Sequence, residues 1–162
     1  VGFYNSRSLI TVRLLTHRSE DITDELIASR VKAACDYRRF VMNREGTDSC
    51  RLIYGEADRL PGVIADRFGD VIVLQVLALG MEKYTQVIAD ALVACENPKC
   101  LLLNNDDAIR RKEGMADHYE DILGSYLVKL GTMSQMFTGM LIPYMTNEMQ
   151  DRSRPYHPFA WS

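Results

Sequence analysis

The sequence lacks the cysteine and hydrophobic patterns that mark several classes of protein. Its four cysteines, Cys35, Cys50, Cys95 and Cys100, form no CxxC pair and have no histidine nearby, which argues against a structural zinc site. No run reaches the roughly 18 apolar residues of a membrane-spanning helix, and no basic-then-apolar signal peptide opens the chain. We therefore expect a cytoplasmic protein with no membrane partner and no metal, whose cysteines are free, buried thiols.

A general excess of positive charge is also missing. With 19 Lys and Arg against 22 Asp and Glu, the net charge is −3, which argues against a strongly basic nucleic-acid surface over the whole chain. Positive charge is nevertheless clustered in two places, and both are candidate RNA-phosphate contacts. The clusters are Arg38, Arg39 and Arg44, and Arg110, Arg111 and Lys112. For the first cluster another interpretation stays open, because cations at a helix end also stabilise the helix dipole.

The apolar residues that are present are grouped into short runs. Between residues 50 and 79, runs at 50–54, 63–66 and 71–79 are separated by a Gly- and Pro-containing bend and by a turn at Phe68-Gly69-Asp70. Short β-rich runs joined by such turns predict a β-meander.

A helix is predicted before the meander. In residues 21–42 apolar side chains recur at steps of three and four, and the stripe includes Tyr37 and Phe40. Asp21 or Thr23 is placed to cap the start of this helix.

After the meander, residues 81–95 have a second helical pattern and residues 100–103 form a short apolar strand. Residues 71–103 thus predict a strand–helix–strand unit, for which parallel pairing is the default. The predicted fold class is α+β: a mixed sheet with a β-meander and two main helices.

The two ends of the chain are harder to assign. Residues 8–15 predict a strand, but no obvious partner precedes it, and Gly2 and the Asn5-Ser6 pair look like turn material. Beyond about residue 130 the sequence has no clean period, and we expect little stable structure there.

Three stretches resemble a known family. Residues 55–70, GEADRLPGVIADRFGD, closely resemble the GEADGLPGLIVDRYGD signature of the ribosomal RNA large subunit methyltransferase I family. Residues 2–15, GFYNSRSLITVRLL, are similar to that family's GFYNPxSxIxVRLL at the end of its PUA domain, and residues 105–115, NDDAIRRKEGM, to its NDxxVRxxEGL. The resemblance covers about residues 2–124 and implies a SAM-dependent cytosine-C5 methyltransferase of 23S rRNA.

The chain also departs from the family pattern. Arg59 stands where the family has Gly, and Asn104 stands where it usually has Arg. After Gly124 the family continues into a Rossmann-like domain with a Gly-rich SAM loop and an NPP-type motif beside a catalytic Cys, and residues 125–162 match none of it. We therefore expect no catalytic residue and no SAM-binding residue in this chain, although SAM is implied for the whole family.

The resemblance predicts three parts. Residues 1–17 are interpreted as the last strand of an incomplete PUA-like domain, residues 18–124 as the family's central α+β domain, and residues 125–162 as a divergent, poorly ordered tail. Within the central domain, Glu56 and Asp58 allow acid–base chemistry, but carboxylates beside Gly and Pro more often bond to turn backbone. The residues assigned to a structural signature are Gly55, Glu56, Asp58, Pro61, Gly62, Asp66, Arg67, Gly69 and Asp70.

Two functions from different classes remain open. In the first, the chain is a fragment of an rRNA methyltransferase that serves as a scaffold and positions ribosomal RNA. In the second, it is a non-catalytic α+β module that forms homo-oligomers through an exposed sheet edge and an apolar tail. The sequence leaves open whether this chain is itself an enzyme and which RNA position is modified.

Overall fold

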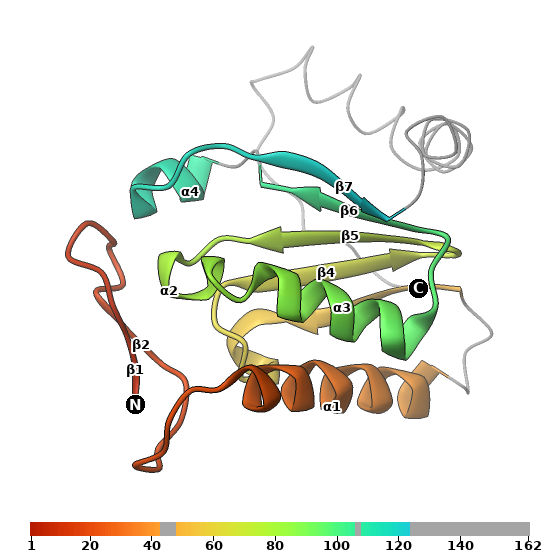
Figure 1. The fold of residues 1–162 in the computed structure, drawn as a ribbon, viewed down its shortest axis with the longest axis horizontal. Coiled ribbons are helices and arrows are strands. Elements are labelled where there is room, and N and C mark those ends of the chain that lie inside the picture. The colour runs from red at the N-terminus through yellow and green to blue at the C-terminus, as the bar shows by residue number, and fades with distance from the viewer. Residues whose placement is uncertain (43–47, 106–107, 124–162) are drawn as a thin grey trace, which may run out of the picture. The chain divides into compact units, whose positions relative to one another are not determined.

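A computed structural model describes residues 1–42, 48–105 and 108–123, all within one compact unit, Val1–Ser125 (Figure 1). The predicted tail and its apolar residues lie outside the described residues, as does Arg44. Within the described ranges, no helix combines the length and the apolar character needed to cross a membrane.

A five-stranded mixed sheet forms the centre of the fold. Its strands, in spatial order, are β3 (Ser49–Tyr54), β4 (Val63–Phe68), β5 (Val71–Val76), β6 (Cys100–Asn104) and β7 (Tyr119–Leu123). The first three are antiparallel neighbours, β5 and β6 are parallel, and β6 and β7 are antiparallel. The predicted meander, the parallel strand–helix–strand unit and the α+β class are confirmed.

Two helices cover one face of this sheet (Figure 1). They are α1 (Asp24–Met42) and α3 (Thr85–Glu96), and the short helix α2 (Leu79–Glu82) precedes α3. Alternate side chains of β5, Ile72 and Leu74, enter one hydrophobic core with Ile88 and Leu92 of α3. Burial of these apolar side chains is the main source of stability for such a layered unit.

Helix α1 begins as predicted, but its buried stripe differs from the prediction. The Leu26 N–H donates to Thr23 Oγ1 at 3.2 Å, so Thr23 acts as the cap. Tyr37 and Phe40, which were predicted to belong to the stripe, are 58% and 68% exposed. The buried face carries Ile27, Val31, Ala34 and Cys35. Arg38 continues this face toward β3, where it donates to the Arg51 carbonyl.

The third meander strand ends earlier than predicted. It was expected to continue to residue 79, but β5 stops at Val76. The Val76 N–H donates to Asn105 Oδ1 at 2.8 Å, and Arg110 donates to the Val76 carbonyl. Because these side chains take the hydrogen bonds that a neighbouring strand would otherwise make, the chain is released into α2.

The N-terminal segment forms a hairpin rather than a strand with no preceding partner. Strand β1 (Gly2–Tyr4) pairs antiparallel with β2 (Val12–Leu14), so a partner does precede β2. This partner begins at Gly2, which had been interpreted as turn material, whereas Ser6 does lie in the turn. A Cβ on Gly2 would lie 2.2 Å from the Arg13 carbonyl oxygen, so this glycine is required for the close pairing of the two strands. Strands of three residues are too short to show an alternating pattern in the sequence.

Candidate functional site

The signature segment, residues 55–70, begins after β3 with a short 3-10 helix, η1 (Gly55–Asp58), continues through β4 and ends at the turn before β5. Arg59, directly after η1, has a φ of 59° and lies in the left-handed region that favours glycine. Gly62 has a φ of 72°, and a Cβ there would lie 2.5 Å from the Ala78 Cβ. Its carbonyl accepts the Leu77 N–H at 2.7 Å, which fixes the bend against the end of the sheet.

The carboxylates of this segment contact cations from other elements. Arg38 of α1 donates to both oxygens of Asp58, at 2.6 and 3.2 Å, and Asp58 also accepts the Tyr54 N–H. Arg13 of β2 donates to Glu56 at 2.8 Å. The two acidic side chains therefore tie η1 to α1 and to the hairpin, and this geometry does not direct them jointly at one reacting group.

Apart from Arg59, the remaining charged residues of the signature segment also form ion pairs. Their partners are Arg51 for Asp66, Glu96 for Arg67 and Lys99 for Asp70. These contacts connect β3, β4, α3 and the turns at the far end of the sheet.

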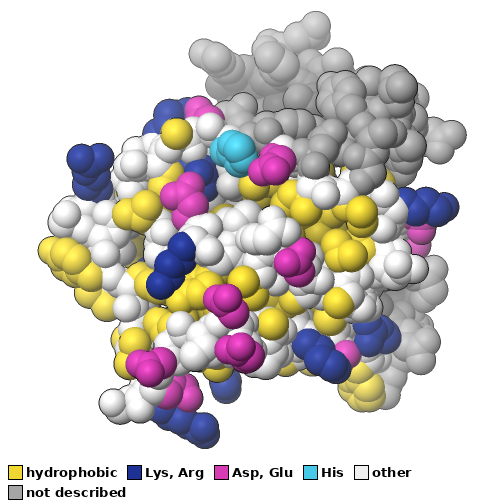
Figure 2. Space-filling view, viewed as in Figure 1, with side chains coloured by type: hydrophobic (Ala, Val, Ile, Leu, Met, Phe, Trp, Pro, Cys, Tyr) yellow, Lys and Arg dark blue, Asp and Glu magenta, His cyan; other side chains and the backbone are white. Residues whose placement is uncertain are grey.

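The residues chosen as RNA contacts are not brought together. The end of α1, with Arg38 and Arg39, lies across the sheet from helix α4 (Ala108–Glu113), which carries Arg110, Arg111 and Lys112 (Figure 1). On the face in Figure 2, Lys and Arg side chains are dispersed among Asp and Glu side chains.

Arg110 is used inside the fold. Its side chain is 1% exposed and donates to the Val76 and Ala116 carbonyls and to Glu82. A phosphate outside the protein cannot reach a guanidinium enclosed in this way. Arg39 and Arg111 are more than half exposed, although Arg39 pairs with Asp36 and Glu96 and Arg111 pairs with Asp117.

Residues 105–115, the third stretch of resemblance, join the hairpin to the sheet. The buried Glu113 accepts hydrogen bonds from Asn5 and Ser8 and pairs with Arg13 at 3.2 Å. Burial raises the pKa of Glu113, but these hydrogen bonds and the charge of Arg13 outweigh it and hold the pKa below the usual 4.5. The motif thus has a structural role in this chain.

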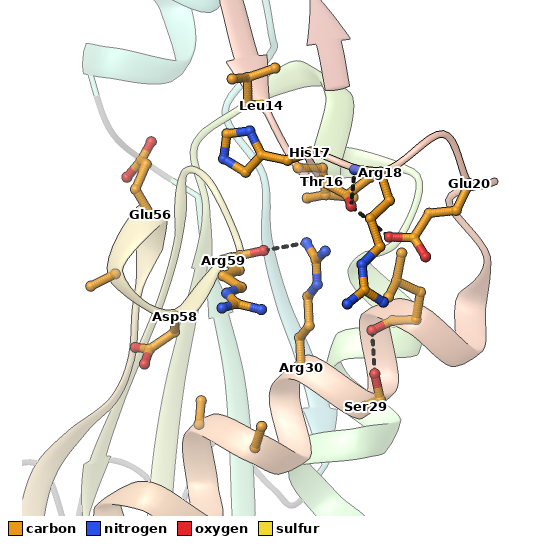
Figure 3. Close-up of a pocket in the computed structure, with 15 residues that line it drawn as sticks. Leu14, Thr16, His17, Arg18, Glu20, Ser29, Arg30, Glu56, Asp58 and Arg59 are labelled. Carbon is orange, nitrogen blue, oxygen red and sulfur yellow. Dashed lines mark hydrogen bonds between the residues drawn. The ribbon is translucent and has the colours of Figure 1, made fainter. Parts of the chain in front are cut away.

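Sequence reasoning missed a pocket of about 830 Å³ between the segment after β2, helix α1 and η1 (Figure 3). Arg18, Arg30 and Arg59 point into it from these three segments. We call it the arginine pocket. Only the replacement of Gly by Arg at position 59 could have drawn attention to it, because the other two arginines follow no motif.

The arginine pocket holds cations at close range. Arg30 Nη1 donates to the Arg59 carbonyl at 2.8 Å. Burial lowers the pKa of Arg30, the charge of Arg59 lowers it further, and Glu20 acts in the opposite direction. Within the described part of the chain, none of the three arginines forms a salt bridge. An anion in the pocket would relieve this unfavourable proximity.

Cys35 and Cys50 have no activating surroundings. Burial is the first cause that raises the pKa of Cys35 and of Cys50 above the ordinary 9.0, which keeps both as thiols. Among residues 1–42, 48–105 and 108–123, no group of three or more His, Cys, Asp or Glu could hold a metal ion.

The carboxyl end of β5 does not fit SAM. Sites of this class lie at the carboxyl ends of parallel strands, beside a Gly-rich turn. At the end of β5 the chain enters α2 without such a turn, and the polar groups of Val76 are already bonded to Asn105 and Arg110. This strand end therefore offers no cradle for the cofactor.

Comparison with known proteins points to one family. No family model matches the chain. Curated proteins named Ribosomal RNA large subunit methyltransferase I, from Salmonella enteritidis and Salmonella gallinarum, are 39% identical over 117 residues. The alignment covers 71% of this chain but 29% of each relative, so the chain spans less than a third of their length.

Solved structures support the same fold. A candidate SAM-dependent methyltransferase from Streptococcus mutans superposes with a TM-score of 0.61 over 76% of this chain and 31% of its own, at 13% identity. A second candidate methyltransferase, in complex with SAH, has a TM-score of 0.57 over 71% of this chain and 28% of its own, at 14% identity. At such identities the likeness concerns the fold alone. The 39% identity to the curated relatives carries the assignment: the chain belongs to the ribosomal RNA large subunit methyltransferase I family.

Proposed function

We propose that this chain is the part of a SAM-dependent rRNA cytosine methyltransferase that positions the RNA substrate. The observation that carries the proposal is the 39% identity to curated rRNA methyltransferases over 117 residues, which is most of this chain. The absence of a cradle for SAM at the end of β5 favours a positioning role for the described residues over a role in methyl transfer. The reaction itself is assigned to the remainder of the enzyme.

The distribution of charge supports contact with a phosphate backbone at particular points. A net charge of −3 disfavours broad electrostatic attraction to RNA. Exposed cations lie on different elements, among them Arg39 and Arg111, each of which also forms an ion pair, and three more line the arginine pocket. Isolated cations of this kind fix the register of a strand without reading its sequence.

Binding to RNA tests the proposal. The 162-residue chain is titrated against a fluorescein-labelled rRNA fragment, and anisotropy is recorded at several KCl concentrations. We expect the logarithm of the binding constant to fall by about 0.7 per contacted phosphate for each tenfold increase in KCl concentration, the value for a single strand. Binding that is independent of salt, or no binding at low salt, would remove the RNA role. Calorimetry with SAM is expected to show no heat of binding, and micromolar binding would contradict the division of roles.

A second candidate function is self-association, and one observation favours it. The hairpin exposes Tyr4, Leu9, Ile10, Val12 and Leu14, with Leu9 92% exposed. Figure 2 shows hydrophobic side chains gathered at the edge of the molecule where the hairpin lies in Figure 1. Apolar surface of this kind promotes association. Light scattering tests it: a concentration-dependent dimer that Leu9→Ser and Val12→Ser abolish would support this function, and a monomer at high concentration would exclude it.

A further inference from the structure

We propose that the arginine pocket binds a backbone phosphate of single-stranded RNA through Arg18, Arg30 and Arg59. This inference rests on the proposed function and names the site at which the RNA is held. The pocket is distinct from both clusters of cations that the sequence suggested.

The three cations reach the pocket from separate parts of the chain. Arg18 lies in the segment after β2, Arg30 on α1 and Arg59 at the end of η1, and Figure 3 shows their side chains pointing into the same hollow. Arg30 bonds only to a backbone carbonyl among its described neighbours, which leaves most of its N–H donors available. Guanidinium groups match the geometry of phosphate oxygens, with two parallel N–H donors for each bidentate contact.

The acidic residues of the pocket do not neutralise these cations. Glu56 is paired with Arg13, and Asp58 with Arg38, and neither of these partners lines the pocket. The third acidic residue, Glu20, accepts a hydrogen bond from Thr16 at 2.5 Å. Three guanidinium groups therefore face one carboxylate that has no arginine partner of its own, so the pocket favours an anion.

The conformation of Arg59 supports a role in binding. A residue other than Gly in the left-handed region costs about 1–2 kcal/mol, and the signature that this segment resembles has Gly here. The backbone is held in place by bonds from the Arg59 N–H to Glu56 and from Arg30 to the Arg59 carbonyl. A strained residue whose side chain enters a pocket is an observation from which function can be inferred.

The size of the pocket favours a nucleotide unit over a bare ion. At about 830 Å³ it lies in the range of ordinary ligand sites and exceeds what one phosphate group fills. Leu14 and Leu26 also line it and offer apolar surface to a ribose or a base. Free phosphate and mononucleotides share the recognised group, and the experiment separates them from RNA.

The test uses the full chain, a labelled single-stranded RNA oligonucleotide and the variants Arg18→Gln, Arg30→Gln and Arg59→Gln, singly and combined. Arg51→Gln is the matched control, because Arg51 is an exposed arginine outside the pocket that pairs with Asp66. We expect each pocket variant to weaken binding about tenfold at low salt. The triple variant should reduce the salt slope by about 0.7, the value for one phosphate contact on a single strand. The control should stay within about twofold of the parent chain. Circular dichroism melts verify that every variant is folded.

The outcomes separate this inference from the proposed function. If the triple variant still binds RNA with an unchanged salt slope, the pocket is not the RNA site, while RNA positioning by other residues stands. If the parent chain itself does not bind RNA, both proposals are wrong. Inorganic phosphate and a nucleoside monophosphate are added as competitors, and NMR detects whether either of them binds in the pocket. If one of them binds there while RNA binding does not depend on the three arginines, the site is for small anions and the RNA assignment is wrong.

Discussion

Arg38 and Asp58 form a two-point ion pair between helix α1 and the end of η1. Arg38 Nη2 lies 2.6 Å from Asp58 Oδ2 and Nη1 lies 3.2 Å from Oδ1, with the two side chains 16% and 10% exposed. The same guanidinium donates through Nε to the Arg51 carbonyl at 2.9 Å. One arginine thus joins α1, β3 and η1, and holds the wall of the arginine pocket that Asp58 forms.

Removing this arginine should destabilise the fold. Arg38→Gln leaves the mostly buried carboxylate of Asp58 without its cation, and we expect a loss of about 2–3 kcal/mol in the free energy of unfolding, at the low end for a buried pair because some solvent reaches it. Urea unfolding measured by circular dichroism gives the value.

Arg51→Gln is the control for this prediction. Its ion pair with Asp66 is 45% and 26% exposed, so we expect a loss of at most about 1 kcal/mol. Equal losses in the two variants would show that the two-point pair contributes no more than an ordinary surface pair.

Replacing Arg59 by Gly should stabilise the protein. Gly relieves a left-handed backbone strain of about 1–2 kcal/mol, but it also gives the unfolded chain more conformational entropy, which offsets part of the effect. We therefore expect the free energy of unfolding to rise by about 0.5–1 kcal/mol. Thermal unfolding measures it. If the pocket binds RNA phosphate, the same variant should bind RNA more weakly while melting at a higher temperature.

Asn97→Gly is the matched control, because Asn97 at the end of α3 also has a positive φ, of 46°. Asparagine tolerates this region better than arginine does, so the gain should be smaller. A gain at position 97 that equals or exceeds the gain at position 59 would argue against special strain at Arg59.

Gly62→Ala should be strongly destabilising. The added Cβ would meet the Ala78 Cβ at 2.5 Å at a φ of 72°, so both backbone strain and overpacking apply, and we expect a loss of about 2–4 kcal/mol. Gly69→Ala provides the comparison: its φ is 56°, but the nearest atom to an added Cβ is 3.7 Å away. Only the strain of about 1 kcal/mol should remain there. Similar losses at the two positions would exclude the contact with Ala78 as the cause.

The stability of the contact between the β1–β2 hairpin and Glu113 of α4 should depend on pH. Because its folded pKa lies below the usual 4.5, the ionised carboxylate contributes stability that is fully present above pH 4.5 and is lost as the pH falls through the folded pKa. Glu113→Gln removes this contribution. The difference in unfolding free energy between parent and variant should therefore be largest near neutral pH and shrink in acid.

Hydrogen exchange of the β1 and β2 amides reports the attachment directly, since the hairpin is held by Asn5, Ser8 and Arg13 at this carboxylate. Asp90→Asn, at an exposed position on α3, should leave amide protection in the hairpin unchanged at every pH. A difference between parent and Glu113→Gln that grows in acid would contradict the assigned direction.

The sequence alone determined the elements whose signals are local. The meander follows from short apolar runs separated by Gly-containing turns, and the start of α1 follows from Thr23, whose capping bond spans three residues. The parallel pairing of β5 and β6 follows from the helix between them. The resemblance at residues 55–70 likewise identified the family.

Only the tertiary structure decided which polar residues are consumed within the fold and which remain available. Arg110 resembles an exposed cation in the sequence, yet it is enclosed because the end of β5 requires a donor for the Val76 carbonyl. Arg18, Arg30 and Arg59 are separated in sequence and converge only because the hairpin, α1 and η1 meet. The spacing of the three arginines along the chain does not predict that they meet, because their meeting depends on the long-range packing of elements that are each specified locally.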